Sequence, residues 1–372
     1  MPDLSASVTH PLPTLRSMTF LPLSNPSQLV IRNQEQFELE HLVVVGLPAD
    51  DLAMRLLDDG VGFITALTRD FSAYRCLLPL ESRLTDRFSL TFAPVLSAEL
   101  SRPVDGVLVF LQKSKPLMDF WLEMVLNFLP EGVPVWLVGE NDEGIKSWKK
   151  RLKGSFGVVK SVDNARHCVL LEALEPLKKP DNFTLEQWFE TFSVSAASMD
   201  MDITSLPGVF SHGRLDRGTQ VLLETLDVVP SGKVLDFGCG AGVISAYINA
   251  MAGDHDFTLV DCDALALASS NKTMSALGSK SFAVLPSDGL SEVTGQFDMI
   301  ISNPPFHQGV KTHYEVTEQF LSQSHQMLRR GGELRIVANS FLRYPPIIQK
   351  AFGHCETLLT KDGFSVYRAV NR

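Results

Sequence analysis

Strand-like and helix-like stretches alternate along the first half of the chain. Continuous apolar, β-branched runs at residues 41–46 and 104–110 predict strands that are buried on both faces. An apolar helix pattern at 120–129 stops at a Pro-Glu-Gly turn, and another strand pattern follows at 135–139. Strands separated by helices are typical of βαβ units, so the pattern predicts an α/β fold with a parallel sheet.

The second half repeats this order about 190 to 200 residues later. Strand patterns at 233–238, 297–301 and 334–338 follow one another as their counterparts do in the first half. This self-similarity predicts an internal duplication, with two tandem Rossmann-like α/β domains in one chain.

Each half closes with a hairpin signal. In the second half a Lys-Asp-Gly sequence separates the strand patterns at 355–359 and 364–370. In the first half the Asp-Asn pair at 163–164 separates 158–162 from 168–171. A hairpin that follows parallel strands predicts a mixed sheet with an antiparallel C-terminal hairpin.

The composition along the chain indicates the domain boundaries. Residues 1–25 contain several prolines and no apolar run, which predicts a loosely held leader rather than a signal peptide. Prolines and serines in 172–200 predict irregular chain between the two halves. We therefore expect an N-terminal domain at 26–180 and a C-terminal domain at 181–372. Asp216 is expected to be the N-cap of a helix early in the second domain.

The overall composition excludes several classes of protein. The 372 residues, 45% hydrophobic and 20% charged, are typical of a soluble globular protein of two domains. No apolar stretch reaches the roughly 18 residues that a membrane span needs. The five cysteines are scattered without a C-x-x-C pair, and the nine histidines form no metal-binding motif. We therefore expect neither disulfides nor a metal, and a reducing cytoplasm as the location.

The distribution of charge leaves a nucleic-acid partner open. A net charge of −10 argues against RNA as a binding partner, because phosphate binding usually needs a basic face. A basic cluster nevertheless lies between residues 146 and 166; its members are Lys146, Lys149, Lys150, Arg151, Lys153, Lys160 and Arg166. This basic cluster is either a solvated helix face or a patch that faces RNA.

The segment Ser302-Asn303-Pro304-Pro305-Phe306 ends the strand pattern at 297–301. Two prolines lack the N–H groups of a sheet ladder, so the strand must end here, at the edge where open α/β sheets bind ligands. The Asn303 side-chain oxygen and the Pro304 carbonyl can accept both hydrogens of an exocyclic amino group, while Phe306 stacks on its ring. The competing interpretation is a plain turn after a strand.

A glycine loop and three acids accompany this segment. Asp236-Phe237-Gly238-Cys239-Gly240-Ala241-Gly242 follows a strand pattern and opens onto a helix, and its glycines let the backbone approach a ligand. Asp261, about 20 residues further on, is placed to bind ribose hydroxyls, with Asp263 as the alternative. Asp288 is either a loop cap or a contact to adenine.

The first half lacks both chemical segments. The sequence Gly-Leu-Pro-Ala-Asp at 46–50 stands where the glycine loop would fall. An apolar run into Gln112 and Lys113 stands where 302–306 would fall. If the duplication is real, the N-terminal copy is degenerate and only the C-terminal copy retains an active site.

The C-terminal half resembles the class I S-adenosylmethionine-dependent methyltransferases. Residues 236–242 are similar to their cofactor loop, Asp261 to their ribose acid, and 303–306 to the signature of enzymes that methylate amino nitrogens. Residues 331–339, the segment 206–210 and the degenerate first half narrow the resemblance to the RsmC-type guanine-N2 methyltransferases of small-subunit ribosomal RNA. The resemblance covers nearly the whole chain after the leader and is strongest from residue 206 onward.

This resemblance implies a function and a set of site residues. It implies methyl transfer from S-adenosylmethionine to the N2 amino group of a guanine in 16S ribosomal RNA, by a cytoplasmic monomer without metal or membrane. The implied cofactor residues are Asp236, Gly238, Cys239, Gly240, Gly242, Asp261 and Asp288. The implied catalytic residues are Asn303, Pro304 and Phe306, and the implied contacts to guanine are Pro305, Phe306 and His307. The N-terminal domain would serve as scaffold and RNA platform.

Other functions remain open at this point. Within the methyltransferases, the alternatives are a guanine-N2 enzyme of large-subunit ribosomal RNA and, more remotely, a protein-glutamine N-methyltransferase. A nicotinamide oxidoreductase would use the glycine loop and Asp261 but has no use for Asn-Pro-Pro-Phe. A non-catalytic RNA-binding protein would explain the degenerate first half but not the intact second half.

Overall fold

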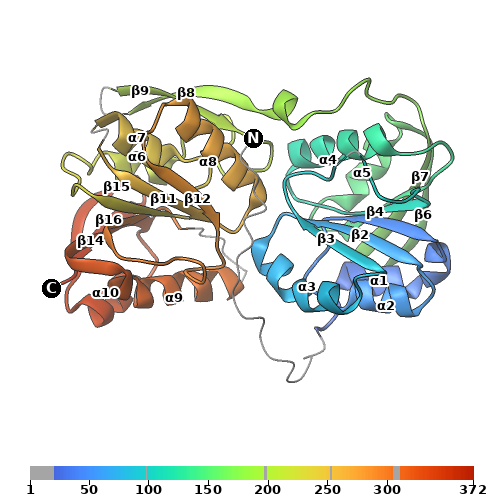
Figure 1. Cartoon of the computed structure of the whole chain (residues 1–372), viewed down its shortest axis with the longest axis horizontal. Coiled ribbons are helices and arrows are strands. Elements are labelled where there is room, and N and C mark those ends of the chain that lie inside the picture. Colours follow the sequence, from blue (N-terminus) through green and yellow to red (C-terminus); the bar gives the residue numbers. More distant parts are fainter. Residues whose placement is uncertain (1–20, 98, 197–198, 252–253, 305–310) are drawn as a thin grey trace.

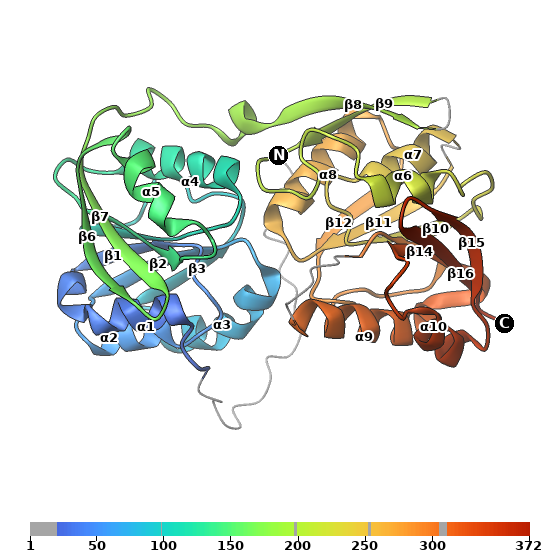
Figure 2. The same cartoon turned by 180° about the vertical axis from the view of Figure 1, so that it is seen from behind.

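The chain forms two α/β domains, each built on a seven-stranded sheet (Figures 1 and 2). The computed structural model describes residues 21–97, 99–196, 199–251, 254–304 and 311–372, with the backbone alone at 311–315. In Figure 1 the N-terminal domain, blue to green, lies on the right, and the C-terminal domain, yellow to red, lies on the left.

The N-terminal domain contains seven strands and five α-helices among its described residues. Its strands are β1 (His41–Val45), β2 (Phe63–Thr68), β3 (Phe88–Phe92), β4 (Gly106–Phe110), β5 (Val135–Glu140), β6 (Phe156–Ala165) and β7 (Cys168–Pro176). Its helices are α1 (Asn25–Arg32), α2 (Leu52–Asp58), α3 (Phe71–Arg83), α4 (Lys115–Phe128) and α5 (Ile145–Leu152), with a 3₁₀ turn at Gln34–Phe37.

The C-terminal domain begins with a 3₁₀ turn (Leu185–Trp188) and a hairpin of β8 (Glu190–Ala196) and β9 (Met199–Ser205). Its sheet contains β10 (Lys233–Phe237), β11 (Asp256–Asp261), β12 (Phe282–Pro286), β13 (Phe297–Ser302), β14 (Leu328–Asn339), β15 (Glu356–Lys361) and β16 (Phe364–Val370). Its helices are α6 (Arg217–Leu223), α7 (Val243–Met251), α8 (Ala264–Ala276), α9 (Lys311–Met327) and α10 (Pro345–Phe352).

The two sheets have the same strand order. The first runs β3-β2-β1-β4-β5-β7-β6 and the second runs β12-β11-β10-β13-β14-β16-β15. In each sheet the first five strands are parallel, and the hairpin pairs antiparallel with the fifth strand. The predicted α/β class, the duplication and the antiparallel C-terminal hairpins are therefore confirmed.

Backbone hydrogen bonds align the two copies residue by residue. The amides of Gly46 and Leu47 donate to the Leu67 carbonyl, at 2.8 and 3.0 Å. The amides of Gly238 and Cys239 donate to the Val260 carbonyl in the same way, at 2.9 and 3.0 Å. Gly46 therefore corresponds to Gly238, as the sequence predicts, and every other residue of the parallel strands can be matched through the strand register.

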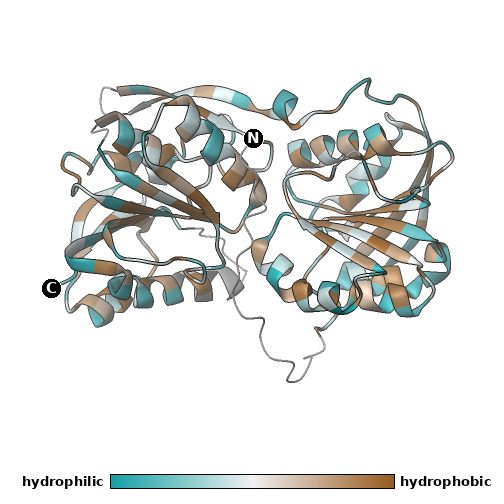
Figure 3. Cartoon of the chain, viewed as in Figure 1, coloured by the Kyte–Doolittle hydropathy of each residue, from teal (hydrophilic) through white to brown (hydrophobic). Residues whose placement is uncertain are grey.

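An apolar core joins the two domains. The central strands are buried along their whole length, and hydrophobic residues follow the strands in both sheets (Figure 3). One continuous cluster of buried side chains includes residues of both sheets. Phe120 of α4 packs against Phe183 and Trp188 of the connecting segment. Gly208 lies so close to α4 that a Cβ there would come within 2.9 Å of the Leu117 side chain. The domains are therefore packed together rather than merely tethered.

Corresponding segments of the two copies meet at the domain junction. The Phe71 amide donates to the Cys262 carbonyl, and the Ala264 amide donates to the Arg69 carbonyl, both at 2.8 Å. Because Phe71 corresponds to Ala264 and Arg69 to Cys262, the contact is approximately two-fold symmetric. Figures 1 and 2 agree, since α4 and α5 lie above their sheet while their counterparts α9 and α10 lie below theirs. Arg69 also forms an ion pair with Asp263 across the junction.

Two details of the sequence interpretation are wrong. The serines at 193–198 indicated irregular chain, but β8 extends through Ala196 and pairs antiparallel with β9. Its alternation of exposed Ser193 and Ser195 with buried Val194 and Ala196 is a strand pattern that the small residues obscured. The first hairpin turns at Arg166 and His167, both at positive φ, rather than at residues 163–164, which lie within β6.

The junction ion pair leads to a prediction about stability. Arg69→Met leaves the partly buried Asp263 carboxyl without its cation and should lower the free energy of unfolding by about 1–3 kcal/mol. The control Arg151→Met breaks a more exposed ion pair with Asp119 and should cost less than about 1 kcal/mol. Urea unfolding of both variants, and of Arg69→Met combined with Asp263→Asn, measures the effect. The junction pair has no special role if Arg69→Met is as mild as the control, or if Asp263→Asn recovers nothing.

Candidate active site

The glycine loop joins β10 to α7 at the carboxyl edge of the second sheet. Gly238, Gly240 and Gly242 have φ angles of +67°, +53° and +79°, in the left-handed region that favours glycine. A Cβ on Gly238 or Gly240 would meet no atom within 4 Å, whereas one on Gly242 would lie 3.2 Å from the Cβ of Ser270 on α8. The first two glycines therefore border open space, and the third allows the loop to pack closely against a helix.

Asp236 lies in β10 just before this loop, and its side chain is fully buried. Its Oδ2 accepts hydrogen bonds from the Ser245 amide and hydroxyl, at 3.2 and 2.7 Å. Its Oδ1 is buried without a hydrogen-bond partner among the described residues. Burial raises the pKa of Asp236 to about 6, and the hydrogen bonds from Ser245 oppose the rise. A buried carboxyl with an unsatisfied oxygen is suited to a ligand that is cationic or donates a hydrogen bond.

Asp261 ends β11 and contacts the glycine loop directly. Its Oδ2 accepts a hydrogen bond from the Gly240 amide at 3.0 Å, and its Oδ1 accepts one from the Asp263 amide at 3.0 Å. The residue is half-buried. Burial, followed by the charge of Asp263, raises the pKa of Asp261 to about 6.

Asp263, the alternative ribose acid, is already engaged. Its Oδ1 accepts the Leu265 amide at 3.0 Å as the N-cap of α8, and its Oδ2 pairs with Arg69. Both oxygens of Asp261 are engaged as well, but one of its partners is the Gly240 amide of the glycine loop, so the geometry favours Asp261 for contact with a ligand beside the loop.

The structure also places Asp288 and Cys239. Asp288 follows Ser287, whose amide donates to the Asp261 carbonyl at 3.0 Å, so Asp288 lies beyond the end of β12 on the same edge. The Cys239 side chain is buried, with its Sγ 3.6 Å from the Ser270 hydroxyl, and burial raises the pKa of its thiol. Cys239 therefore belongs to the loop by its backbone, while its side chain packs toward α8.

Asn303 follows directly on β13, next to β10. The Ser302 hydroxyl donates to the Phe237 carbonyl at 2.6 Å, which ties the start of this segment to the residue before the glycine loop. The Asn303 Nδ2 donates to Asp216 Oδ2 at 3.0 Å and to Thr219 Oγ1 at 2.8 Å. Pro304 is buried. Pro305, Phe306 and His307 lie outside the described residues.

Two contacts of Asn303 were missed from the sequence. Asp216 is the N-cap of α6, as predicted, because its Oδ2 accepts the Thr219 amide at 2.9 Å. The same oxygen also receives Asn303, and Thr219 had not been singled out at all. The available signal was the Asp-x-x-Thr spacing, which places a hydroxyl beside the capping carboxylate.

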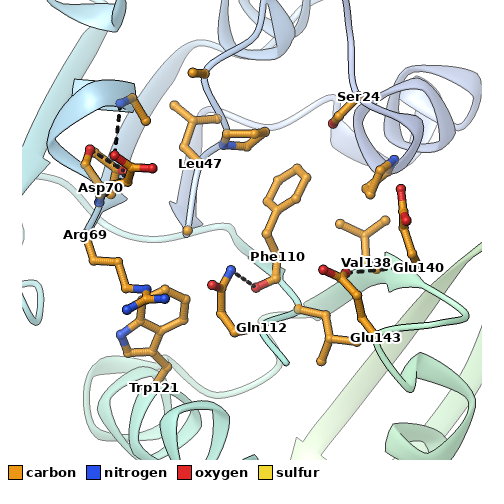
Figure 4. Close-up of a pocket in the computed structure, with 18 of the residues that line it drawn as sticks. Ser24, Leu47, Arg69, Asp70, Phe110, Gln112, Trp121, Val138, Glu140 and Glu143 are labelled. Atoms are coloured by element: carbon orange, nitrogen blue, oxygen red, sulfur yellow. Dashed lines mark hydrogen bonds between the residues drawn. The ribbon is translucent and has the colours of Figure 1, made fainter. Parts of the chain in front are cut away.

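The corresponding edge of the first sheet lacks the two acids and the amide at the matched positions. The strand register places Val44 where the second domain has Asp236, and Phe110 where it has Asn303. The matched backbone hydrogen bonds place Thr68 at the position of Asp261. A cavity of about 610 Å³ lies at this edge (Figure 4). Its lining includes Phe110, Trp121, Gln112 and Glu143, and a Cβ on Gly46 would come within 3.0 Å of the Trp121 ring.

The described residues hold no group of three or more His, Cys, Asp or Glu side chains placed to bind a metal ion. None of the helices in the described part of the chain is long and apolar enough to cross a membrane.

Comparisons with known proteins agree with this geometry. The family model for the methyltransferase small domain matches residues 200–368, and the model for its N-terminal domain matches 27–192. The ribosomal RNA small subunit methyltransferase C of Stutzerimonas stutzeri is 40% identical over 92% of this chain and 98% of its own. The protein of the same name from Vibrio vulnificus is 39% identical over the same shares.

A solved structure shows the same two-domain fold. It is the T. thermophilus 16S rRNA N2 methyltransferase RsmC in complex with AdoMet and guanosine, with a TM-score of 0.76, 23% identity and 91% coverage of both chains. Fold, glycine loop and edge acids together define a two-domain Rossmann-like methyltransferase. More specifically, the chain belongs to the ribosomal RNA small subunit methyltransferase C family.

Proposed function

We propose that this chain transfers a methyl group from S-adenosylmethionine to the N2 amino group of a guanine in 16S ribosomal RNA. The observation that carries the proposal is the position of Asn303 at the carboxyl edge of the sheet. The preceding residue, Ser302, donates a hydrogen bond to Phe237, at the end of the strand that leads into the glycine loop. The names of the relatives and the guanosine in the solved RsmC complex support the choice of substrate.

The residues around the glycine loop fit the proposed cofactor. S-adenosylmethionine supplies an electrophilic sulfonium methyl group when bound, and it also carries an ammonium group and two ribose hydroxyls. The unsatisfied Oδ1 of Asp236 suits a cationic or donating group, and Asp261 suits the hydroxyls. The space beside Gly238 and Gly240 admits a ligand close to the backbone. Asp288, on the same edge, would lie near the adenine.

Asn303 and Pro304 would hold the substrate. The guanine amino group is a poor nucleophile because its lone pair is delocalised into the ring. The Asn303 side-chain oxygen and the Pro304 carbonyl would accept its two hydrogens and favour the positive charge that develops on nitrogen. Pro305, Phe306 and His307 would contact the base, with Phe306 holding the ring plane. The amine needs no strong base before attack, since its proton can leave afterwards.

The N-terminal domain would serve as scaffold and RNA platform and bind no cofactor. Val44, Thr68 and Phe110 offer neither a carboxylate nor an amide at the three decisive positions, which supports this assignment. The domains at 26–180 and 181–372 complete the proposed organisation, and of the expected leader at 1–25 the last residue, Asn25, already begins α1. We propose that the enzyme acts as a monomer in the cytoplasm, on the small ribosomal subunit or its RNA.

The direct test is transfer of a tritiated methyl group to naked 16S RNA, to each ribosomal subunit and to protein release factors. Label in 16S RNA, recovered as N2-methylguanine, is the expected result. Label confined to large-subunit RNA or to a release factor would replace the proposed substrate with one of the alternatives.

Asn303→Ala should slow the methyl transfer step. It removes one of two preorganised acceptors at the reacting nitrogen, which typically costs about 2.7–4 kcal/mol, or roughly 100- to 1,000-fold in rate. Cofactor affinity should hardly change, because Asp236, Asp261 and the glycines remain. Single-turnover methylation at saturating cofactor, beside a binding titration, measures both quantities. Near-normal turnover, or a parallel loss of cofactor binding, would show that the assigned role is wrong.

Cofactor binding should depend on pH, with a single site per chain. Asp236 and Asp261, with pKa values of about 6, take up protons as the pH falls through 6, and the affinity should fall by up to about tenfold per pH unit for each. The folding stability of the free protein changes in the opposite direction. The raised pKa values of the two acids contribute folding stability that is present below the ordinary pKa of 3.8 and lost as the pH rises through 6. The increase in Tm on adding cofactor should therefore grow between pH 5 and 7.5.

Asp261→Asn tests this assignment. It should weaken cofactor binding at pH 7.5 by about 1.5–3 kcal/mol and make the pH dependence shallower, because one of the two titrating groups is gone. Calorimetry across the pH range gives affinity and stoichiometry together. A pH dependence identical to the wild type would exclude Asp261, and two sites per chain would contradict the degenerate first domain.

The basic cluster should contribute to RNA affinity through its free lysines. Lys146, Lys149 and Lys150 are exposed on α5, whose other face is buried, whereas Arg151 and Lys160 pair with Asp119 and Glu172. Replacing the three lysines by Glu should weaken RNA binding and reduce its salt dependence, by about one unit of slope for each phosphate that the variant no longer neutralises.

A charge-matched control separates this patch from net charge. Lys280, Lys350 and Arg372 are also exposed, and their replacement by Glu makes the same change in total charge. Filter binding at several salt concentrations compares the two triple variants. An equal loss of RNA affinity in both variants would show that the lysines of α5 form only a solvated helix face.

A further inference from the structure

The Asn303 side chain is held through its amide nitrogen. Its Nδ2 carries two hydrogens, and both have an acceptor: Asp216 Oδ2 at 3.0 Å and Thr219 Oγ1 at 2.8 Å. Both hydrogen bonds of this side chain to the described residues are made by its nitrogen. The donor half of the amide is therefore used within the protein, and the acceptor half is left.

A carboxylate neighbour makes this orientation the stable one. An asparagine amide can rotate by 180° and exchange its oxygen and nitrogen at nearly the same shape. After such a rotation the Asn303 oxygen would face Asp216 Oδ2, and an ionised carboxylate has no hydrogen to donate. Two acceptors would then be in contact, so Asp216 disfavours the rotated state, and Thr219 alone could tolerate it by donating its hydroxyl hydrogen.

The start of α6 builds this two-acceptor arrangement. As N-cap, Asp216 accepts the Thr219 amide at 2.9 Å, and this places the Thr219 hydroxyl beside the same carboxylate. Thr219 is buried, so its hydroxyl stays directed inward. Gly218 leaves room for the carboxylate, because a Cβ there would come within 3.0 Å of both Asp216 Oδ2 and the Phe364 ring. Helix α6 is itself tied to the last hairpin, through the ion pair between Arg217 and Asp362.

We propose that Asp216 and Thr219 are positioning residues that orient the Asn303 amide so that its oxygen accepts the substrate amine. This inference rests on the proposed function, in which Asn303 holds the guanine N2 amino group. In the rotated state Asn303 would present its own N–H groups to the substrate amine, and donors would face donors. The negative charge on Asp216 also polarises the amide and strengthens its oxygen as an acceptor.

Three substitutions test the orientation. Thr219→Val keeps the side-chain shape but removes one acceptor, and Asp216→Asn can still cap the helix through its oxygen but removes the negative charge that disfavours the rotated amide. Each should lower the single-turnover rate about tenfold or more, with cofactor affinity unchanged. Thr219→Ser should recover most of the loss. The control Thr191→Val removes the comparable hydrogen bond to Thr204, at 3.0 Å in the β8–β9 hairpin, and should leave the rate unchanged.

A mutant cycle separates positioning from a structural effect. In an Asn303→Ala background the amide is absent, so Thr219→Val and Asp216→Asn should cause no further loss of rate. Asn303→Asp alone places two carboxylates together and should be slow. When it is combined with Asp216→Asn, which removes the repulsion between the two carboxylates, part of the rate should return.

The side-chain amide can also be observed without turnover. The Asn303 NH₂ signals in a ¹⁵N spectrum, assigned by their loss in Asn303→Ala, should be shifted and slow to exchange in the wild type. Thr219→Val and Asp216→Asn should each bring them toward the values of free amides.

The outcomes distinguish the two levels of the proposal. A fast Asn303→Ala variant refutes the role of Asn303 and with it the proposed chemistry. If Asn303→Ala is slow, the positioning role is refuted when Thr219→Val and Asp216→Asn are fast, when they slow the Asn303→Ala background equally, or when the NH₂ signals do not change.

Discussion

The parallel pairing of β10 with β11 and β13 is the constraint on which the site depends. Phe237, one residue after Asp236, pairs with Val260 on one side and with Ser302 on the other. Because parallel strands end at a common edge, Asp236, Asp261 and Asn303 come together although the sequence separates them by tens of residues. Each lies at or next to the end of its strand, where its side chain forms hydrogen bonds with partners outside the strands. The glycine loop, Ser245 and the start of α6 provide most of these partners.

Comparison of the two domains shows that the acids at this edge are not needed for the fold. In the second domain, Asp236 and Asp261 retain carboxyl groups whose pKa values are raised to about 6 by burial, and one oxygen of Asp236 has no partner in the described structure. In the first domain Val44 and Thr68 occupy these positions, and the strand order is unchanged. The fold therefore does not need the acids. Their presence in one copy is an unfavourable burial that a ligand would compensate, which is why they indicate function rather than stability.

Most of the fold and much of the candidate site could be predicted from the sequence. The central strands are continuous apolar runs, and both the glycine loop and the Asn-Pro-Pro segment carry their chemistry locally. The parts that could not be predicted depend on contacts between distant segments. Small residues hid the β8 strand, and only the hairpin partner shows why Arg166 and His167 make the turn. Thr219 looked like an ordinary residue of α6 until the fold brought it to Asn303.

The domain junction suggests why the degenerate copy stays attached. Asp261 interacts with two other carboxyls, since the charge of Asp263 raises its pKa and its own charge raises that of Asp236. Arg69, which comes from the first domain, pairs with Asp263 and lowers the cost of ionising it. The same segment is joined to Cys262 and Ala264 by the two symmetric backbone hydrogen bonds. The first domain thus lacks the acids of its own sheet edge. It supplies one cation, Arg69, and two backbone contacts to the segment that follows Asp261 in the second domain. Through that cation, the first domain acts on the electrostatics of the second.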